Sequence, residues 1–211
     1  FKSKKLSGHR VNDKILFDGE NIILGDNKGN ITVYSVNEKK TIFKYNFYKK
    51  KFKKIKKKLS LAIENNIIYT ADNLGYLYSI DYRKKKLLWA KDLKIPFRSN
   101  LKLVKNKIIV ADQNNTFYVF NKFNGSQLKF VPTEETIIKN DFINSIVLYK
   151  NSFIYLNTFG SLYSINNQNL EINWFSNLKR SFDLNPTDLF FSNPVIAFKD
   201  KIILSTDPYL Y

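Results

Sequence analysis

The chain has 211 residues, of which 44% are hydrophobic and 16% aromatic, so it is long enough to bury a sizeable core. It contains no cysteine, which excludes disulfides and thiolate metal sites in this stretch. The formal net charge is +17. A charge of this size suits a nucleic-acid or anionic-membrane partner, and it also suits a sequence in which lysine, isoleucine and asparagine are abundant throughout.

Short segments rich in β-branched and aromatic residues, separated by turns, follow one another along the chain and predict strands. The first hairpin turns at Asp18–Gly19, a dipeptide typical of a tight primed turn. No convincing amphipathic helix interrupts the series, so the expected class is all-β. The strands group in fours, and the last group is incomplete. The predicted groups are approximately 11–48, 59–92, 100–132, 142–176 and 194–211.

One pattern recurs at a fixed place in each group, and it is clearest at Ala71–Asp81 followed by Trp89. When the copies are aligned on the turn residue, the intervals are 75−29=46, 115−75=40 and 160−115=45. A unit of this length that repeats is typical of four-stranded β-propeller blades. The aligned turn residues are Gly29, Gly75, Asn115 and Gly160, and three residues before them stand Asp26, Asp72, Asp112 and Asn157.

The copy at Gly75–Asp81 with Trp89, and the copy at Gly160–Asn166 with Trp174, resemble the PQQ-like repeat (Gly-x-Leu-Tyr-Ala-Leu-Asp, a turn, an aliphatic pair and Trp). The other two copies are weaker, with Phe43 and Phe130 assigned to the Trp position. The resemblance implies a β-propeller. Proteins with such repeats include quinoprotein dehydrogenases, which hold pyrroloquinoline quinone and Ca²⁺, and the non-enzymatic BamB-like lipoproteins of outer-membrane β-barrel assembly, which are eight-bladed periplasmic scaffolds.

The motif residues are interpreted as scaffold rather than as a ligand site. Glycine adopts a positive φ at low cost, an aromatic residue on the fourth strand is expected to fill the wedge between blades, and the polar residue that ends the third strand can bond the next turn. The structural motif residues are Gly29, Asp72, Gly75, Asp81, Trp89, Gly125, Gly160 and Trp174.

The sequence offers little for catalysis. The vicinal cysteine pair common in quinoprotein enzymes is missing, and His9 is the only histidine, which excludes a multi-His metal site here. Glu134–Glu135 is an acidic pair, and paired carboxylates can do acid–base work, but an exposed loop pair is the simpler interpretation. We therefore predict no catalytic, cofactor-binding or metal-binding residues, no cofactor and no enzymatic activity.

The most unusual stretch is 49–58, in which eight of ten residues are lysine. It joins the first two groups of strands, on the same face as the turn at Gly75. It could be a solvated loop, a contact to anionic lipid headgroups, or a contact to an acidic protein or nucleic acid. Lysine rather than arginine disfavours bidentate phosphate recognition. The candidate interaction residues are Lys49, Lys50, Lys51, Phe52, Lys53, Lys54, Lys56, Lys57 and Lys58.

A second long connection, 176–193, contains Phe190–Phe191. Long loops on rigid scaffolds often carry binding. Alternatively, the two phenylalanines begin the next inner strand and are buried.

The resemblance leads us to expect a non-enzymatic BamB-like scaffold with protein partners in the outer-membrane assembly machinery. Its place would be the periplasm, with an anchoring lipidated cysteine upstream of this stretch. Because the chain stops within a predicted strand, we expect a fragment of a larger, eight-bladed ring. The alternatives are a fragment of a quinoprotein dehydrogenase, or a basic propeller that binds an anionic membrane or nucleic acid.

Overall fold

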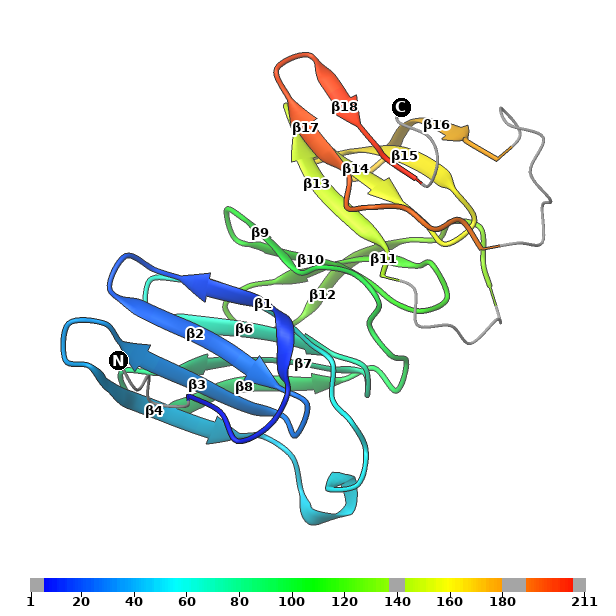
Figure 1. Ribbon diagram of the computed structural model, residues 1–211. Coiled ribbons are helices and arrows are strands. Elements are labelled where there is room, and N and C mark those ends of the chain that lie inside the picture. The colour runs from blue at the N-terminus through cyan, green and yellow to red at the C-terminus, as the bar shows by residue number, and fades with distance from the viewer. Residues whose placement is uncertain (1–5, 137–142, 180–188, 207–211) are drawn as a thin grey trace. The chain divides into compact units, whose positions relative to one another are not determined.

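A computed structural model describes residues 6–136, 143–179 and 189–206 (Figure 1). These residues form two compact units. Unit 1 runs to Phe97 and includes Phe123–Gly125; unit 2 comprises Arg98–Lys122 and the residues from Ser126 onward. Among the described residues, no helix is long and apolar enough to span a membrane.

Unit 1 contains two four-stranded antiparallel sheets in which the strands pair in chain order. A short 3₁₀ helix, η1 (Lys50–Phe52), lies in the connection between the two sheets. The strands of the first sheet are β1 (Val11–Phe17), β2 (Asn21–Asp26), β3 (Asn30–Ser35) and β4 (Lys40–Asn46). The strands of the second are β5 (Leu59–Glu64), β6 (Ile67–Asp72), β7 (Tyr76–Asp81) and β8 (Lys86–Asp92).

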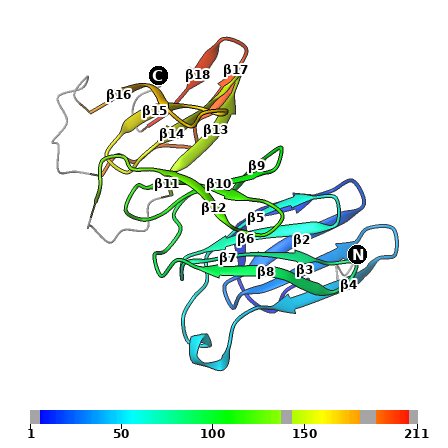
Figure 2. The ribbon, with the colours of Figure 1, turned by 180° about the vertical axis from the view of Figure 1, so that it is seen from behind.

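Unit 2 contains two further four-stranded antiparallel sheets and a two-stranded hairpin (Figure 2). The third sheet comprises β9 (Lys102–Val104), β10 (Lys107–Ala111), β11 (Phe117–Asn121) and β12 (Gln127–Val131). The fourth comprises β13 (Ser145–Tyr149), β14 (Ser152–Leu156), β15 (Ser161–Asn166) and β16 (Ile172–Asn177). The hairpin comprises β17 (Ile196–Phe198) and β18 (Lys201–Ile203). The all-β class predicted from the repeat is confirmed.

The second and third strands of each four-stranded sheet carry the core. Every residue of β6 except Ile67 is buried, whereas β16 is exposed along most of its length. In unit 1 the buried cluster includes Ile23, Val33 and Tyr78. The inner strands therefore supply most of the apolar burial that stabilises each sheet, and the fourth strands lie at sheet edges.

Each sheet has an irregularity at the same place, between its third and fourth strands. Ser79 pairs with Trp89, and the next pair skips one residue of β8. In the third sheet the residue equivalent to Trp89, the last one paired before the β-bulge, is Lys129, which lies opposite Val119. The assignment of Phe130 to the Trp position is therefore wrong by one residue, because the β-bulge, rather than hydrophobicity, fixes the register.

Aromatic residues on the fourth strands are expected to fill the wedge between blades, and of the two tryptophans only Trp89 does so. Trp89 lies against Gly125, where a Cβ atom would collide with the indole. Trp174, in contrast, is 44% exposed on the edge strand β16. Because Trp174 is this exposed, the expected packing between blades is not met there.

Candidate interaction surface

The four aligned turns share one hydrogen-bond arrangement. At each, a buried Asp or Asn is the last residue of the second strand or directly follows it, and its Oδ1 accepts from the backbone N–H groups two and four residues later. At Asp72 these bonds come from Leu74 and Tyr76, at 2.8 and 2.9 Å. The residue between them, Gly75, has φ +91°. Each side chain is thus used by its own turn, as the scaffold interpretation predicts. The four residues are Asp26, Asp72, Asp112 and Asn157.

The polar residues that end the third strands also bond the following turns. Ser35 Oγ accepts from Glu38 N at 3.1 Å, and Asp81 Oδ1 accepts from Lys84 N at 2.9 Å. Asn166 Oδ1 accepts from Gln168 N at 2.8 Å. This part of the motif is structural, as predicted.

A residue from the connection between two sheets completes two of the four turns. The Tyr48 hydroxyl donates to Asp72 Oδ2 at 2.5 Å. In unit 2, Asn157 Nδ2 donates to Glu134 Oε2 at 3.4 Å. Tyr48 and Glu134 stand at the same distance after their turn residues (48−29=19 and 134−115=19). Tyr48, a hydrogen-bond donor, therefore lies beside the acceptor Asp72. Glu134, an acceptor, lies beside the donor Asn157. Glu134 and Glu135 are both exposed, as the sequence predicts. The contacts of Tyr48 and Glu134 with their turns are not predicted by the sequence pattern.

Equivalent aspartates have pKa values shifted in opposite directions. Burial raises the pKa of Asp72, and the hydrogen bonds from Tyr48, Tyr76 and Leu74 offset this only in part. Burial also acts to raise the pKa of Asp26, but bonds from Asn30, Lys28 and Ser7 outweigh it, and the pKa is lowered. Burial raises the pKa of Asp112, whose Oδ2 has no hydrogen-bond partner within the described residues.

The lysine-rich connection, residues 49–58, is held in place by its own side chains and by the turn after β6. The Lys57 ammonium donates to the carbonyl of Phe52 and lies 5.1 Å from the centroid of the Tyr48 ring. The Phe52 ring packs edge-on against Tyr48 and Tyr76, with centroids 6.5 and 5.9 Å away. The turn after β6 holds the end of the loop, because Asn73 donates to Lys56 O at 3.0 Å and accepts from Lys58 N at 2.8 Å.

Lys57 and Phe52 support this loop rather than present themselves to a partner. Lys57 is only 2% exposed, and its main-chain N–H donates to Asn27 O at 2.9 Å. Burial and the charge of Lys28 lower the pKa of Lys57, while Asp72 and Asp26 act in the opposite direction. The prediction that all nine residues form one interaction surface therefore needs correction at these two positions. The lysines that remain exposed are Lys49, Lys50, Lys51, Lys53, Lys54, Lys56 and Lys58.

The exposed lysines project from the end of unit 1 at which the turns after β2 and β6 lie, as the sequence predicted. The coiled ribbon of η1 stands out from the sheets at this end (Figure 1). We call this end, made of residues 49–58 and the exposed Lys28, the lysine end. Of the aspartates at the β2–β3, β6–β7 and β8 turns there, Asp26 and Asp72 are buried and Asp92 pairs with Lys94 at 2.5 Å.

The opposite end of unit 1, formed by the remaining turns of the same two sheets, carries charges of both signs. Arg83 lies 3.5 Å from Glu20, and Lys40 lies 2.7 Å from Glu38. Asp18 adds a further carboxylate, which accepts from Glu20 N and from the Tyr82 hydroxyl. The two ends of unit 1 thus differ in charge, and the lysine end is the strongly positive one.

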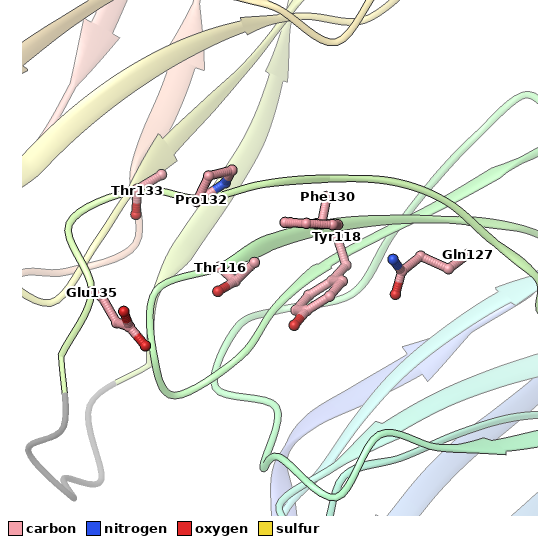
Figure 3. A pocket seen from close by; sticks show the side chains of 7 residues that line it. All are labelled: Thr116, Tyr118, Gln127, Phe130, Pro132, Thr133 and Glu135. Atoms are coloured by element: carbon pink, nitrogen blue, oxygen red, sulfur yellow. The ribbon is translucent and has the colours of Figure 1, made fainter.

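A hollow of about 270 Å³ lies beside β12 in unit 2 (Figure 3). Tyr118 and Phe130 lie next to each other in it, with ring centroids 6.3 Å apart. Burial and the nearby Asp112 raise the pKa of Tyr118 to about 12, so its hydroxyl stays protonated at neutral pH. Glu135 is the one carboxylate of the lining. The lining residues are Thr116, Tyr118, Gln127, Phe130, Pro132, Thr133 and Glu135.

The remaining candidates do not converge. His9 lies exposed before β1. Phe190 is buried over Gly160, where a Cβ would approach its ring to 2.7 Å, whereas Phe191 is 68% exposed. Neither phenylalanine belongs to a strand, so the expected inner strand does not begin there. Residues 180–188 of that connection lie outside the described residues. Among the residues that the structure describes, no group of three His, Asp or Glu side chains could hold a metal ion.

Solved structures resemble this arrangement of four-stranded sheets. BamB from Moraxella catarrhalis superposes with a TM-score of 0.65 at 10% identity, over 97% of this chain and 58% of the BamB chain. The chain has a β-propeller fold. The β-propeller domain of Cps50 (Swd1) from Myceliophteria thermophila superposes with a TM-score of 0.69 at 11% identity, over 96% of this chain and 63% of that one. The computationally designed Ika8 protein gives 0.61 at 9% identity, over 95% and 69%.

The propeller therefore spans little more than half the length of the BamB structure that it matches. No protein-family model matches the sequence, and no curated protein sequence matches it significantly. At these identities the likeness shows the fold alone.

Proposed function

We propose that this propeller is a non-enzymatic protein-interaction scaffold of the BamB kind, which acts in the periplasm in the assembly of outer-membrane proteins. The observation that carries the proposal is that the polar residues of the repeat bond the backbone of their own turns. Each of Asp26, Asp72, Asp112 and Asn157 is buried and holds its own turn. The motif therefore builds the blades, and function falls to the loops that the blades present.

The sequence motif and the fold support the same proposal. The copies at Gly75 and Gly160 resemble the PQQ-like repeat found in BamB-like proteins, and a BamB structure is among the similar folds. The lysine end supplies a loop that is held in place by Lys57 and Asn73. A scaffold needs such a rigid, presented surface, and it needs no catalytic group.

Deletion of the gene tests the proposal directly. We expect the outer membrane of the deletion strain to contain less of its β-barrel proteins, measured by quantitative mass spectrometry of isolated outer membranes. A plasmid copy should restore them, and the tagged protein should fractionate with the periplasm or the outer membrane. Unchanged β-barrel levels, together with dye-linked alcohol oxidation that depends on added pyrroloquinoline quinone and Ca²⁺, would overturn the proposal in favour of a dehydrogenase.

A further inference from the structure

The lysine end of unit 1 concentrates positive charge. Seven lysines of the loop are exposed, and the exposed Lys28 of the β2–β3 turn adds another. The closest aspartates in sequence and space, Asp26 and Asp72, are buried and bonded to backbone N–H groups. Like charges held this close repel one another, so an anionic surface that spreads over the whole end would relieve the repulsion.

The loop is held in a fixed place, unlike a freely solvated run of lysines. Phe52 is packed on Tyr48 and Tyr76, and Asn73 bonds the main chain on both sides of Lys57. Within the loop, Phe52 N donates to Lys49 O and Ile55 N donates to Phe52 O. Because the backbone is already ordered, binding through the lysines costs less conformational entropy.

The loop also carries an exposed apolar side chain. Ile55 is 44% exposed, with Lys54 and Lys56 on either side, both exposed. An isolated aliphatic residue inside a basic patch fits a lipid interface, where lysines meet headgroups and the aliphatic group enters the acyl boundary. It has no comparable use on a phosphodiester backbone.

The aromatic residues also argue against single-stranded nucleic acid, which binds by stacking its bases on exposed rings. Tyr48, Phe52 and Tyr76 stack on one another edge to face. The charged groups of the loop are lysines, which act as point charges, whereas arginine provides the bidentate fork for bases and phosphates.

We propose that the lysine end binds the surface of an anionic phospholipid membrane, with the exposed lysines on the headgroups and Ile55 in the interface. This surface is independent of the proposed role in outer-membrane protein assembly. The two can fail separately, because binding to pure lipid needs no assembly partner.

Sedimentation of the full chain with vesicles tests the proposal. We expect binding to phosphatidylcholine vesicles that contain phosphatidylglycerol, no binding to phosphatidylcholine alone, and a steep loss of binding with salt. Replacing Lys49, Lys50, Lys51, Lys53 and Lys54 with glutamine should weaken binding at least about a hundredfold, since each lysine near such a surface contributes about fivefold. Ile55→Gln should weaken it about fivefold and leave the salt dependence unchanged.

The matched control removes the same charge from the opposite end of unit 1, by glutamine at Lys39, Lys40, Lys84, Lys85 and Lys86, all of which are exposed. That variant should keep most of the vesicle binding, and arginine at the five loop positions should retain it. Equal losses in the two glutamine variants would show a net-charge effect and overturn the proposal. So would absence of binding to the phosphatidylglycerol vesicles, or tighter binding to an acidic peptide or to DNA than to those vesicles at the same salt concentration.

Discussion

The Tyr48 hydroxyl lies 2.5 Å from Asp72 Oδ2 and ties the connection between two sheets to the turn of the second sheet. The same tyrosine ring covers Gly29, where a Cβ atom would collide with it. One side chain therefore joins the turns of two neighbouring sheets in unit 1. The lysine loop begins directly after Tyr48, so this contact also fixes where the loop starts.

Removal of that hydroxyl should destabilise unit 1. In Tyr48→Phe the ring still covers Gly29, but Asp72 Oδ2 loses its donor in a buried site. A lost hydrogen bond to a charged group costs about 1.5–3 kcal/mol, and urea unfolding at neutral pH should show a loss in this range. The control is Tyr34→Phe, because Tyr34 is also partly buried and lies on β3 away from Asp72. Equal losses in both variants would contradict the assigned role.

The equivalent aspartates Asp26 and Asp72 should respond to pH with opposite signs. The pKa of Asp26 is lowered from 3.8, so its contribution to stability is present above the unfolded pKa and lost as the pH falls through the folded one. The pKa of Asp72 is raised from 3.8, so the native state binds more protons and wild-type stability falls as the pH rises from about 4.

Unfolding of Asp26→Asn and Asp72→Asn across about pH 3 to 7 checks these signs. The Asp26→Asn change should become more harmful, relative to wild type, as the pH rises. The Asp72→Asn change should become less harmful. Parallel pH profiles for the two variants would show that the burial and bonding of these turns do not differ as described.

The pairing of Asn157 with Glu134 predicts a double-mutant effect. Asn157→Asp would place a second carboxylate where Nδ2 now lies 3.4 Å from Glu134 Oε2. Two like charges at that separation should cost about 1–3 kcal/mol. Adding Glu134→Gln should recover most of the loss, measured by thermal unfolding. A full additive loss in the double variant would mean that the two side chains are not coupled.

Gly75 is required by both its backbone and its surroundings. Its φ is +91°, and a Cβ atom would lie 2.9 Å from the main-chain N and O of Ile95. Gly75→Ala should therefore cost at least about 2 kcal/mol. Gly8→Ala is the control, since Gly8 has nothing within 4 Å of its Cβ position and should change the urea midpoint little.

Lys57 should hold the lysine loop in shape. In Lys57→Ala the ammonium that donates to Phe52 O is missing, and the amides of Phe52, Lys53 and Ile55, which close the turns of the loop, should exchange faster with deuterium. Lys53→Ala removes an exposed lysine of the same loop and should leave the exchange rates unchanged. Similar exchange in the two variants would show that the buried ammonium does not order the loop.

The repeat and the all-β fold could be predicted because their signals are local. The bonds from Asp72 reach only to Tyr76, and spacing in the sequence encodes them directly. Tyr48 and Glu134 lie 24 and 23 residues from their partners, too far for a turn pattern to show. One signal for these contacts is present in the sequence. Equivalent turns carry Asp72 in one copy and Asn157 in another, and the residues nineteen positions after the preceding turn residues, Tyr48 and Glu134, change from a donor to an acceptor in step with them.

The errors of detail have physical causes. Lys57 looks the same as its neighbours in a run of lysines, and only its place beside Asn27 and Tyr48 buries it. Phe130 fits the Trp position by its hydrophobicity, although the β-bulge puts Lys129 at that position. Trp174 fits the motif, yet its packing depends on what covers an edge strand, which a single repeat does not encode.

Site-specific photo-crosslinking in living cells tests most directly whether the lysine end is the interacting end. A photoreactive amino acid would replace the exposed Ile55 of the lysine loop, and in a second strain it would replace Lys39 on the exposed turn of the opposite end. We predict crosslinks to phospholipid from position 55, identified by mass spectrometry, and few from position 39. Equal crosslinking from both positions, or none from position 55, would contradict the account.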